Sequence, residues 1–323
     1  MGRVAITGGS GFIGTNLVEH YRALGWDVLN ISDVEPTLAR HRGFWREASI
    51  LDERALGAAL SDFKPKLLIH LAARTDLDGT TLADYAANTI GVQNVVAAVN
   101  RTASLERAIY ASTRLVFRVD HQPRNDYDYS ATTMYGKSKI EGERVVKSQP
   151  KDCVPWTLIR PTTIWGPHGA AGQPAFFVQV LRGHYVHPRG RRILKTFGYV
   201  GNVVYEIAKL GEAPREAVAG KAFFVADYAP VEVREWADMI RRAAGAGAVR
   251  DVPLAVLKAA SRLGDLLNAA GLKVPLTTFR LGNLLTPMEY DMSALQAVVG
   301  PLPHTLEESV AATVAWLRDA GRV

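Results

Sequence analysis

A glycine-rich turn that follows a short apolar run at the N-terminus constrains the fold of this chain more than any other feature. Residues 4–6 have the apolar character of a buried strand, residues 7–14 read TGGSGFIG, and residues 15–21 begin a helical pattern. Glycines let the backbone turn sharply and approach a pyrophosphate, and the free N–H groups of the following helix attract its negative charge. We therefore predict a βαβ unit that binds a dinucleotide, although turns with a purely structural role also use glycine.

A Tyr-x-x-x-Lys motif adds chemistry to this unit. Tyr135 and Lys139 are four residues apart and therefore share one face of a helix. Upstream, the apolar run 107–111 is followed by two hydroxyl residues, Ser112 and Thr113. Open parallel sheets bind their ligands at the carboxyl ends of the strands. We predict that these hydroxyl residues lie at such a strand end.

The composition is that of a globular protein. The chain has 323 residues, of which 48% are hydrophobic and 22% are charged. No uncharged apolar run reaches the roughly 18 residues that a membrane span needs, and the N-terminus lacks the apolar region of a signal peptide. The single cysteine, Cys153, excludes an internal disulfide and a cysteine-rich metal site. We expect a cytoplasmic protein without a membrane span or a bound metal.

The formal net charge of +6 and the pI of about 9.4 raise the question of an anionic partner. Either the basic residues form a solvated loop, or they receive an anionic substrate such as a sugar diphosphate. Nucleic acid is not expected, because no aromatic residues alternate with the basic ones. The densest basic cluster is Arg182, Arg189, Arg191, Arg192 and Lys195.

Strand and helix patterns alternate along the first half of the chain, which predicts a doubly wound α/β sheet of the Rossmann type. We assign residues 1–167, with about 197–215, to this dinucleotide-binding domain. Residues 168–196 and 216–323 form a smaller, mostly helical C-terminal substrate lobe. The expected strands are 3–7, 27–32, 67–71, 107–111, 156–160 and 221–226, and the expected helices include 85–100, 175–182, 233–244 and 306–319.

With these motifs, the chain resembles the extended short-chain dehydrogenase/reductase family, also called the NAD-dependent epimerase/dehydratase family. The resemblance covers nearly the whole chain. Further matching segments are His70-Leu71-Ala72-Ala73, Asn88 in NTIGV, Arg160-Pro161, Trp165-Gly166-Pro167 and Tyr290-Asp291-Met292-Ser293.

The resemblance implies a role for each residue of the site. Tyr135 acts as the acid or base, and a nearby lysine ammonium together with a positive nicotinamide ring favours its phenolate. Thr113, with Ser112 as the fallback, binds the substrate oxygen; Lys139 holds the nicotinamide ribose, and Asn88 supports this network. The implied cofactor-binding residues are Gly8, Gly11, Phe12, Ile13, Gly14, Ser32, Asp33, Ser49, Ile50, Leu71, Ala72, Ala73, Tyr135, Lys139, Pro161 and Ile164. The implied substrate residues are Arg74, Ser112, Thr163, Trp165 and Lys195.

The end of the second strand leaves open whether the chain binds NAD or NADP. The family usually has an acidic residue at the end of this strand, where it binds the ribose hydroxyls. Here Ser32 occupies that position and Asp33 follows it. Asp33 at the ribose favours NAD, whereas Ser32 with Arg40 or Arg42 would accept the 2′-phosphate of NADP. We expect NAD.

The resemblance also narrows the reaction. Sugar dehydratases of the family carry Asp-Glu after the catalytic threonine, whereas this chain has Arg114-Leu115, so a dehydratase is not expected. We expect an epimerase or a keto-sugar reductase that acts on a nucleotide-sugar, in a homodimer. Lys195 replaces an arginine that commonly grips the diphosphate, and Thr163 replaces an asparagine.

Two other functions stay open. The apolar segment 253–285 resembles the hydroxysteroid-dehydrogenase branch of the family and would suit a dehydrogenase of a steroid- or isoprenoid-like alcohol. The third function is that of a non-catalytic scaffold that senses a dinucleotide.

Overall fold

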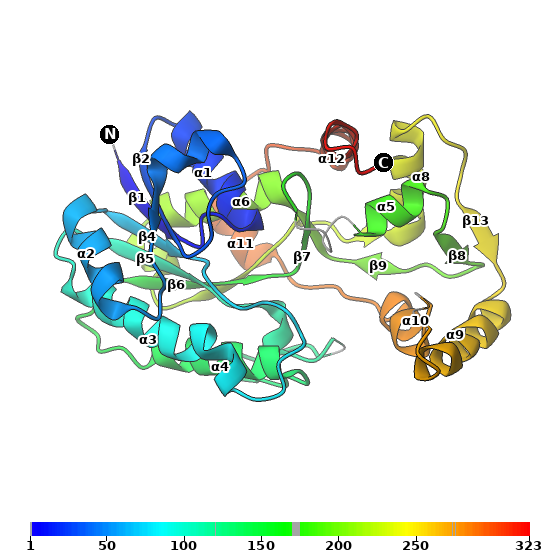
Figure 1. Cartoon of the computed structure of the whole chain (residues 1–323), viewed down its shortest axis with the longest axis horizontal. Helices are drawn as coiled ribbons and strands as arrows, with labels where there is room; N and C mark the ends of the chain where they lie inside the picture. Colours follow the sequence, from blue (N-terminus) through cyan, green and yellow to red (C-terminus); the bar gives the residue numbers. More distant parts are fainter. Residues whose placement is uncertain (1, 120, 170–174, 273, 275) are drawn as a thin grey trace.

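A parallel sheet of seven strands forms the centre of the larger unit, in the order β11-β6-β5-β4-β1-β2-β3 (Figure 1). The computed structural model describes every residue except 1, 120, 170–174, 273 and 275. The doubly wound fold predicted from the sequence is thereby confirmed. The strands are β1 (Arg3–Thr7), β2 (Asp27–Ser32), β3 (Trp45–Glu47), β4 (Leu67–His70), β5 (Arg107–Ala111), β6 (Trp156–Pro161) and β11 (Ala222–Val225).

Helices cover both faces of this sheet, because side chains alternate between the two faces along each strand. Val4 and Ile6 of β1 join a core with Leu17, whereas Ala5 between them joins a second core with Leu56. In Figure 1, α1 and α6 lie on one side of the sheet and α2, α3 and α4 on the other. These helices are α1 (Phe12–Ala23), α2 (Glu53–Phe63), α3 (Ala86–Arg101), α4 (Met134–Lys147) and α6 (Val200–Glu212).

Two edges of the sheet differ from the prediction. The strand β3 was not predicted, because its three residues are polar or only half-buried at the edge of the sheet. The predicted division assigns residues 216–323 to the substrate lobe, but β11 pairs with β6 in this sheet. Its buried Phe223 and Val225 complete the core there, so this segment lies with the larger unit.

The second lobe contains helices and short strand pairs (Figure 1). Its strands pair β8 with β13, and β9 with β12, while β7 pairs with β10 between the two units. The strands are β7 (Thr163–Trp165), β8 (Val186–Pro188), β9 (Leu194–Lys195), β10 (Phe197–Tyr199), β12 (Val231–Glu232) and β13 (Arg250–Val252). The helices are α5 (Ala175–Leu181), α8 (Val233–Ala243), α9 (Leu254–Ala269), α10 (Thr278–Leu285) and α12 (Leu306–Asp319).

Short helices complete the structure, and they are η1 (Ala39–Phe44), η2 (Ala83–Tyr85), η3 (Arg114–Val116), α7 (Arg215–Val218) and α11 (Ser293–Val299). The last helix, α12, has the predicted bounds because its start carries a capping box. The Thr305 hydroxyl accepts a hydrogen bond from the Glu308 N–H at 3.2 Å, and the Glu308 carboxylate accepts one from the Thr305 N–H at 2.9 Å.

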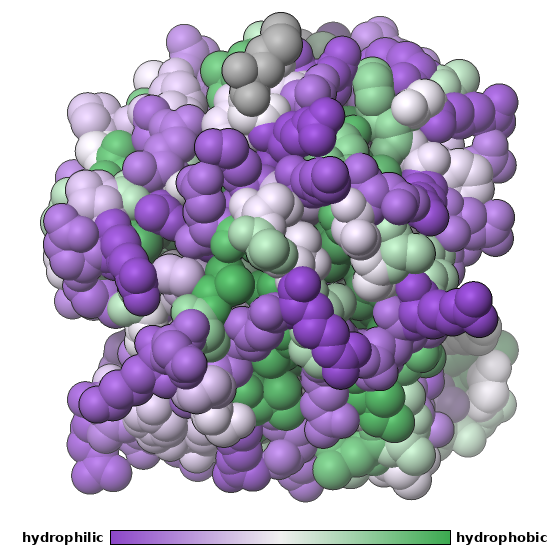
Figure 2. All heavy atoms as spheres, turned by 90° about the vertical axis from the view of Figure 1, so that its left-hand side faces the viewer, coloured by the Kyte–Doolittle hydropathy of each residue, from purple (hydrophilic) through white to green (hydrophobic). Residues whose placement is uncertain are grey.

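The surface of the larger unit is mainly hydrophilic on the face shown in Figure 2, where apolar residues emerge in patches across its middle and lower part. No helix in the described part of the chain is both long and apolar enough to cross a membrane.

The glycine turn connects β1 to α1 through unusually close backbone contacts. Gly8 has a φ of +72°, and a Cβ atom there would lie 2.6 Å from the backbone nitrogen of Ala72. A Cβ atom on Gly14, in the first turn of α1, would lie 2.2 Å from the carbonyl oxygen of Gly8. Only glycine allows this approach of the helix to the turn.

We expect the substitution Gly14→Ala to lower the free energy of unfolding by about 1–3 kcal/mol, because the added methyl group forces the turn and α1 apart. The matched control is Gly57→Ala in α2, where a Cβ atom meets nothing within 4 Å. Alanine in a helix interior is more stable than glycine, so the control should gain about 0.5–1 kcal/mol. Urea unfolding measures both changes, and equal effects of the two substitutions would contradict the prediction.

Candidate active site

A cavity of about 620 Å³ lies at the carboxyl ends of the central strands. This volume is in the range of small-molecule sites. Nineteen of the predicted site residues line it: Gly8, Gly11, Phe12, Ile13, Gly14, Ser32, Asp33, Ser49, Ile50, Leu71, Ala72, Ala73, Arg74, Ser112, Thr113, Tyr135, Lys139, Pro161 and Ile164. The lining residues that sequence reasoning missed are Ser10, Ile31, Val34, Ala48, Leu51, Thr75, Ala87, Ala111 and Thr162. Each of them is a chain neighbour of a predicted residue, so this adjacency was the signal that could have found them.

The part of the cavity next to α1 fits the pyrophosphate of a dinucleotide. Gly11 caps α1 without a side-chain hydrogen bond, so the N–H groups of the first turn are left for a ligand. Gly8 and Gly14 present no Cβ atom there, and added Cβ atoms would collide with backbone. The residues at this end of the cavity therefore fit the cofactor that the sequence predicts.

The end of β2 presents a carboxylate to the cavity, whereas a site for the 2′-phosphate of NADP needs positive charge. Asp33 is exposed and lines the cavity, and the Ser32 hydroxyl accepts a hydrogen bond from the Val34 N–H at 3.2 Å. The two candidate arginines lie outside the cavity lining, in ion pairs with glutamates. Arg40 pairs with Glu19 at 2.9 Å, and Arg42 pairs with Glu35 at 2.7 Å.

Three predicted catalytic side chains meet at the end of β5. Thr113 follows this strand and caps η3, where its hydroxyl accepts a hydrogen bond from the Leu115 N–H at 3.2 Å. Tyr135 lies in the first turn of α4 and lines the same cavity as Thr113. One helical turn later, the Lys139 ammonium donates a hydrogen bond to the Ala111 carbonyl at 3.0 Å. The hydroxyl pair and the ammonium therefore share one corner of the cavity.

Burial governs the pKa values in this corner. It raises the pKa of Tyr135 to about 12, although the neighbouring Thr113 side chain acts in the opposite direction. Burial also lowers the pKa of Lys139 to about 8, against the opposing charge of Glu143. Desolvation of the phenol is the largest influence on the pKa of Tyr135 and shifts it upward, whereas the favoured phenolate that the resemblance implies also depends on a positive nicotinamide ring beside Tyr135.

Asn88, predicted as part of the catalytic set, is buried next to the site and contacts two of its segments. Its fully buried side chain accepts a hydrogen bond from the Arg74 N–H at 3.0 Å and donates to the Arg74 carbonyl at 2.9 Å. It also donates to the Ser138 hydroxyl at 2.9 Å, and this hydroxyl donates to the Tyr135 carbonyl at 2.7 Å. Asn88 thus connects the loop after β4 to the turn of α4 that carries Tyr135, without lining the cavity.

Three predicted substrate residues do not line the cavity. Thr163 is exposed on β7. Trp165 is only 2% exposed, because its ring packs against Phe177 and Trp236 in the core. Lys195 is 3% exposed, and its ammonium donates hydrogen bonds to the backbone carbonyls of residues 283, at 2.8 Å, and 286.

The Lys195 ammonium binds backbone carbonyls, not a diphosphate, because of where this side chain lies. The two carbonyls lie at the C-terminal end of α10, which carries a partial negative charge. Burial, with a smaller contribution from the charge of Arg114, lowers the pKa of Lys195 to about 8. The side chain therefore holds α10 against β9 in this structure.

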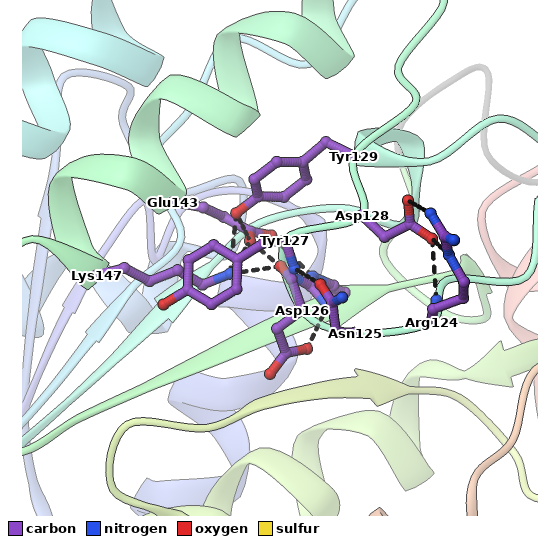
Figure 3. Close-up of polar contacts among 9 residues, drawn as sticks. Arg124, Asn125, Asp126, Tyr127, Asp128, Tyr129, Glu143 and Lys147 are labelled. Atoms are coloured by element: carbon purple, nitrogen blue, oxygen red, sulfur yellow. Dashed lines mark hydrogen bonds and ion pairs between the residues drawn. The ribbon is translucent and has the colours of Figure 1, made fainter.

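A buried ionic network lies beside the catalytic corner (Figure 3). Arg160 of β6 donates two hydrogen bonds to the Glu143 carboxylate, at 2.8 and 2.7 Å, and one to Asp126 at 2.9 Å. Lys147 donates to Glu143 at 3.1 Å, to the Tyr129 hydroxyl at 2.9 Å and to the Asp126 carbonyl at 2.7 Å. These contacts hold the segment that follows η3 against α4.

Glu143 is the central acceptor of this network, and sequence reasoning missed it. Burial alone would raise the pKa of its carboxyl group, but hydrogen bonds and charges from Arg160 and Lys147 hold this pKa at about 2. Glu143 follows Lys139 by one helical turn, and its charge favours the protonated lysine. A signal was present in the sequence, since the spacing of four residues from Tyr135 to Lys139 repeats at Glu143.

We expect Glu143→Gln to lower the free energy of unfolding by about 3–5 kcal/mol, because Arg160 and Lys147 lose their buried counter-ion. Glu141→Gln on the same helix is the matched control. Its ion pair with Arg144 is exposed, so the loss there should be at most about 1 kcal/mol. Urea unfolding of both variants measures the difference, and similar losses would refute the importance of the network.

Comparisons with known proteins agree with this geometry. A 4-hydroxy-2-methyl-3-oxo-4-farnesyl-3,4-dihydroquinoline-1-oxide ketoreductase of Stigmatella aurantiaca is 27% identical over 277 residues, covering 82% of this chain and 80% of that protein. A 2-alkyl-3-oxoalkanoate reductase of Stenotrophomonas maltophilia is 26% identical over 335 residues, covering 95% and 97%. The structure of UDP-glucose 4-epimerase from Thermotoga maritima superposes with a TM-score of 0.74 at 19% identity, covering 98% and 99%, which shows the shared fold.

The profile of one family matches residues 4–226, which contain the glycine turn, the strand ends and the Tyr135–Lys139 helix. This chain belongs to the NAD dependent epimerase/dehydratase family.

Proposed function

We propose that this protein is an NAD-dependent oxidoreductase that interconverts a ketone and a secondary alcohol on a lipophilic substrate. The observation that carries the proposal is the gathering of the Tyr135, Thr113 and Lys139 side chains at the end of β5, within the cavity that the glycine turn enters. This is the donor set that a carbonyl oxygen needs as it becomes an alkoxide.

The residues divide the chemistry among themselves. A dinucleotide held by the glycine turn, as NADH, would supply the hydride for the carbonyl carbon. The Thr113 hydroxyl donates a hydrogen bond to the substrate oxygen, and Tyr135 transfers its phenolic proton to this oxygen, so that the ketone becomes an alcohol. Lys139 stabilises the phenolate that remains. Alcohol oxidation uses the same groups in reverse.

The protonated form of Tyr135 is the one that the proposed ketone reduction uses. Burial raises the pKa of Tyr135 to about 12, so this side chain is protonated at neutral pH in the absence of a ligand. A protonated phenol is the form that donates to a carbonyl oxygen. We do not propose a dehydratase, because Arg114 and Leu115 follow Thr113 and offer no carboxylate for that reaction.

A lipophilic substrate agrees with the placement of the predicted substrate residues. Lys195, Trp165 and Thr163 lie outside the cavity lining, which leaves the nucleotide-sugar prediction without three of its five residues. The reductases from Stigmatella and Stenotrophomonas are named for substrates with a farnesyl or an alkyl chain. We infer that this chain likewise takes a ketone with an extended hydrocarbon part.

A nucleotide-sugar epimerase is the second candidate. The observation in its favour is the exposed basic turn of Arg189, Arg191 and Arg192 in the second lobe, which would attract a diphosphate. We keep the homodimer as a proposal as well, with α3 and α4, which pack against each other, at the contact.

We expect Tyr135→Phe to lower kcat by about 10²–10⁴-fold, because the substitution removes the proton donor while it keeps the ring. NADH binding should change little. Consumption of NADH with a panel of 2-alkyl-3-oxo acids and keto-steroids measures the rate. The control is Tyr127→Phe, which removes a hydroxyl from a side chain that is 66% exposed.

Each outcome of this panel separates the candidates. Turnover of UDP-sugars without turnover of the lipophilic ketones would replace the first candidate by the second. Equal rates of the wild type and the Tyr135→Phe variant would refute the assigned role of Tyr135. A chain that binds NADH and turns over neither class would favour the non-catalytic scaffold.

We also expect NADH to bind more tightly than NADPH, because the Asp33 carboxylate repels a 2′-phosphate. Asp33→Ser should strengthen NADPH binding by about tenfold, which corresponds to about 1.4 kcal/mol. Fluorescence titration of both dinucleotides measures the two dissociation constants. The control is Glu47→Gln, which removes a charge from an exposed residue at the end of β3. Tighter binding of NADPH by the wild type would contradict the assignment.

A further inference from the structure

The hairpin of α9 and α10 lies at the end of the second lobe (Figure 1), and it exposes large apolar side chains. The exposed fractions are 54% for Val256, 56% for Leu263, 69% for Leu266 and 73% for Phe279. These values exceed what a helix of a soluble protein normally shows on its outer face, which is polar. The apolar character of this segment was apparent in the sequence, but its exposure was not.

The exposed apolar residues of α9 lie on one continuous face. Val256, Ala259, Leu263 and Leu266 follow one another at intervals of three or four residues, and all four are exposed. At 100° per residue, their positions fall within one sector of the helix. This apolar face is separate from the buried face of α9, which contains Leu257, Ser261 and Gly264.

The buried face of α9 fixes the hairpin. A Cβ atom on Gly264 would lie 1.9 Å from the carbonyl oxygen of Leu276, so the helix approaches the chain that leads into α10 very closely. Asp265 accepts hydrogen bonds from the Thr278 N–H at 3.2 Å and from the Thr278 hydroxyl at 2.6 Å. Lys195 holds the other end of α10. The apolar face is therefore presented by a well-connected hairpin.

Positive charge borders the apolar face. Lys258 and Arg262 are exposed on α9, one helical turn apart, and they lie to one side of the sector that contains Leu263. Arg250 is exposed on β13, just before α9. An apolar face with lysine and arginine along its border is the pattern of a helix that lies in the interface of a lipid bilayer.

We propose that the α9–α10 hairpin docks this protein onto the surface of a membrane that contains anionic lipids. The apolar face enters the boundary between headgroups and acyl chains, while Lys258 and Arg262 contact the negative headgroups. A second copy of this chain fits the face less well, because it would bring the two cationic borders close to each other. The hairpin lies on the surface and does not span the bilayer, since α9 has 16 residues.

Docking of this kind goes beyond the proposed reaction and does not depend on it. A lipophilic substrate would reach the enzyme from the bilayer, but the surface would bind lipid whether or not the ketone chemistry is correct. Vesicle binding and turnover are therefore separate measurements, and the failure of one leaves the other intact.

The test is co-sedimentation of the full chain with vesicles of phosphatidylcholine, with and without phosphatidylglycerol. We expect about tenfold or stronger binding to the anionic vesicles. The double variant Leu263→Glu with Leu266→Glu should lose about tenfold or more of this binding, because charged side chains would have to enter the apolar boundary. Lys258→Glu with Arg262→Glu should remove the preference for phosphatidylglycerol.

The matched control is Leu24→Glu, which places the same charge on an exposed leucine in the larger unit; this leucine is 52% exposed. All the substituted side chains are exposed, and unchanged NADH binding checks that each variant is folded. The proposal is overturned if the wild type binds neither kind of vesicle, or if the double leucine variant binds as well as the control. It is also overturned if sedimentation equilibrium shows that the leucine pair holds two copies together, since the face would then be a protein interface.

Discussion

The burial of charge along one face of α4 is the constraint on which the site depends. Tyr135, Lys139 and Glu143 follow each other at single helical turns, and all three are buried between α4 and the end of the sheet. Burial lowers the pKa of Lys139 and raises that of Tyr135, so neither side chain has its ordinary proton affinity. The negative charge of Glu143 acts against burial and raises the pKa of Lys139. The active corner and the ionic network beside it are therefore one electrostatic unit.

This unit also holds the segment that follows η3. Arg160 and Lys147 hold Glu143 ionised, and the same two cations bind Asp126 in the segment after η3. Thr113 caps the start of η3, just before this segment. Buried ion pairs of this kind contribute little net stability when intact, but the loss of one partner is costly. Their value here lies in the geometry that they impose on the site.

Aromatic packing joins the second lobe to the first. Trp165 of β7, Tyr199 of β10 and Trp236 of α8 form one cluster, with ring centroids 5.2–5.3 Å apart along the pairs that share Trp165. This cluster uses residues from both units. The α9–α10 hairpin lies beyond it and shares little of this core, which leaves its apolar face free for another surface.

Local spacing determined what the sequence alone could predict. The glycine turn, the Tyr135–Lys139 pair and the alternation of strands and helices depend on residues that are close together in the chain. They predicted the fold, which the structure confirms, and also the cofactor-binding and catalytic residues, including the supporting role of Asn88, which stay predictions. Their signals are local because φ angles, helical spacing and strand burial are set within a few residues.

Only the tertiary structure decided which side chains are buried and what they meet. Lys195 reads as a ligand for phosphate in the sequence, but the end of α10, some 90 residues later, surrounds its ammonium. Glu143 reads as a surface residue of a helix until Arg160 of β6 is placed beside it. The exposure of Leu266 likewise depends on what packs around α9. Burial depends on contacts between distant segments, and desolvation of a charge or exposure of an apolar face follows from those contacts alone.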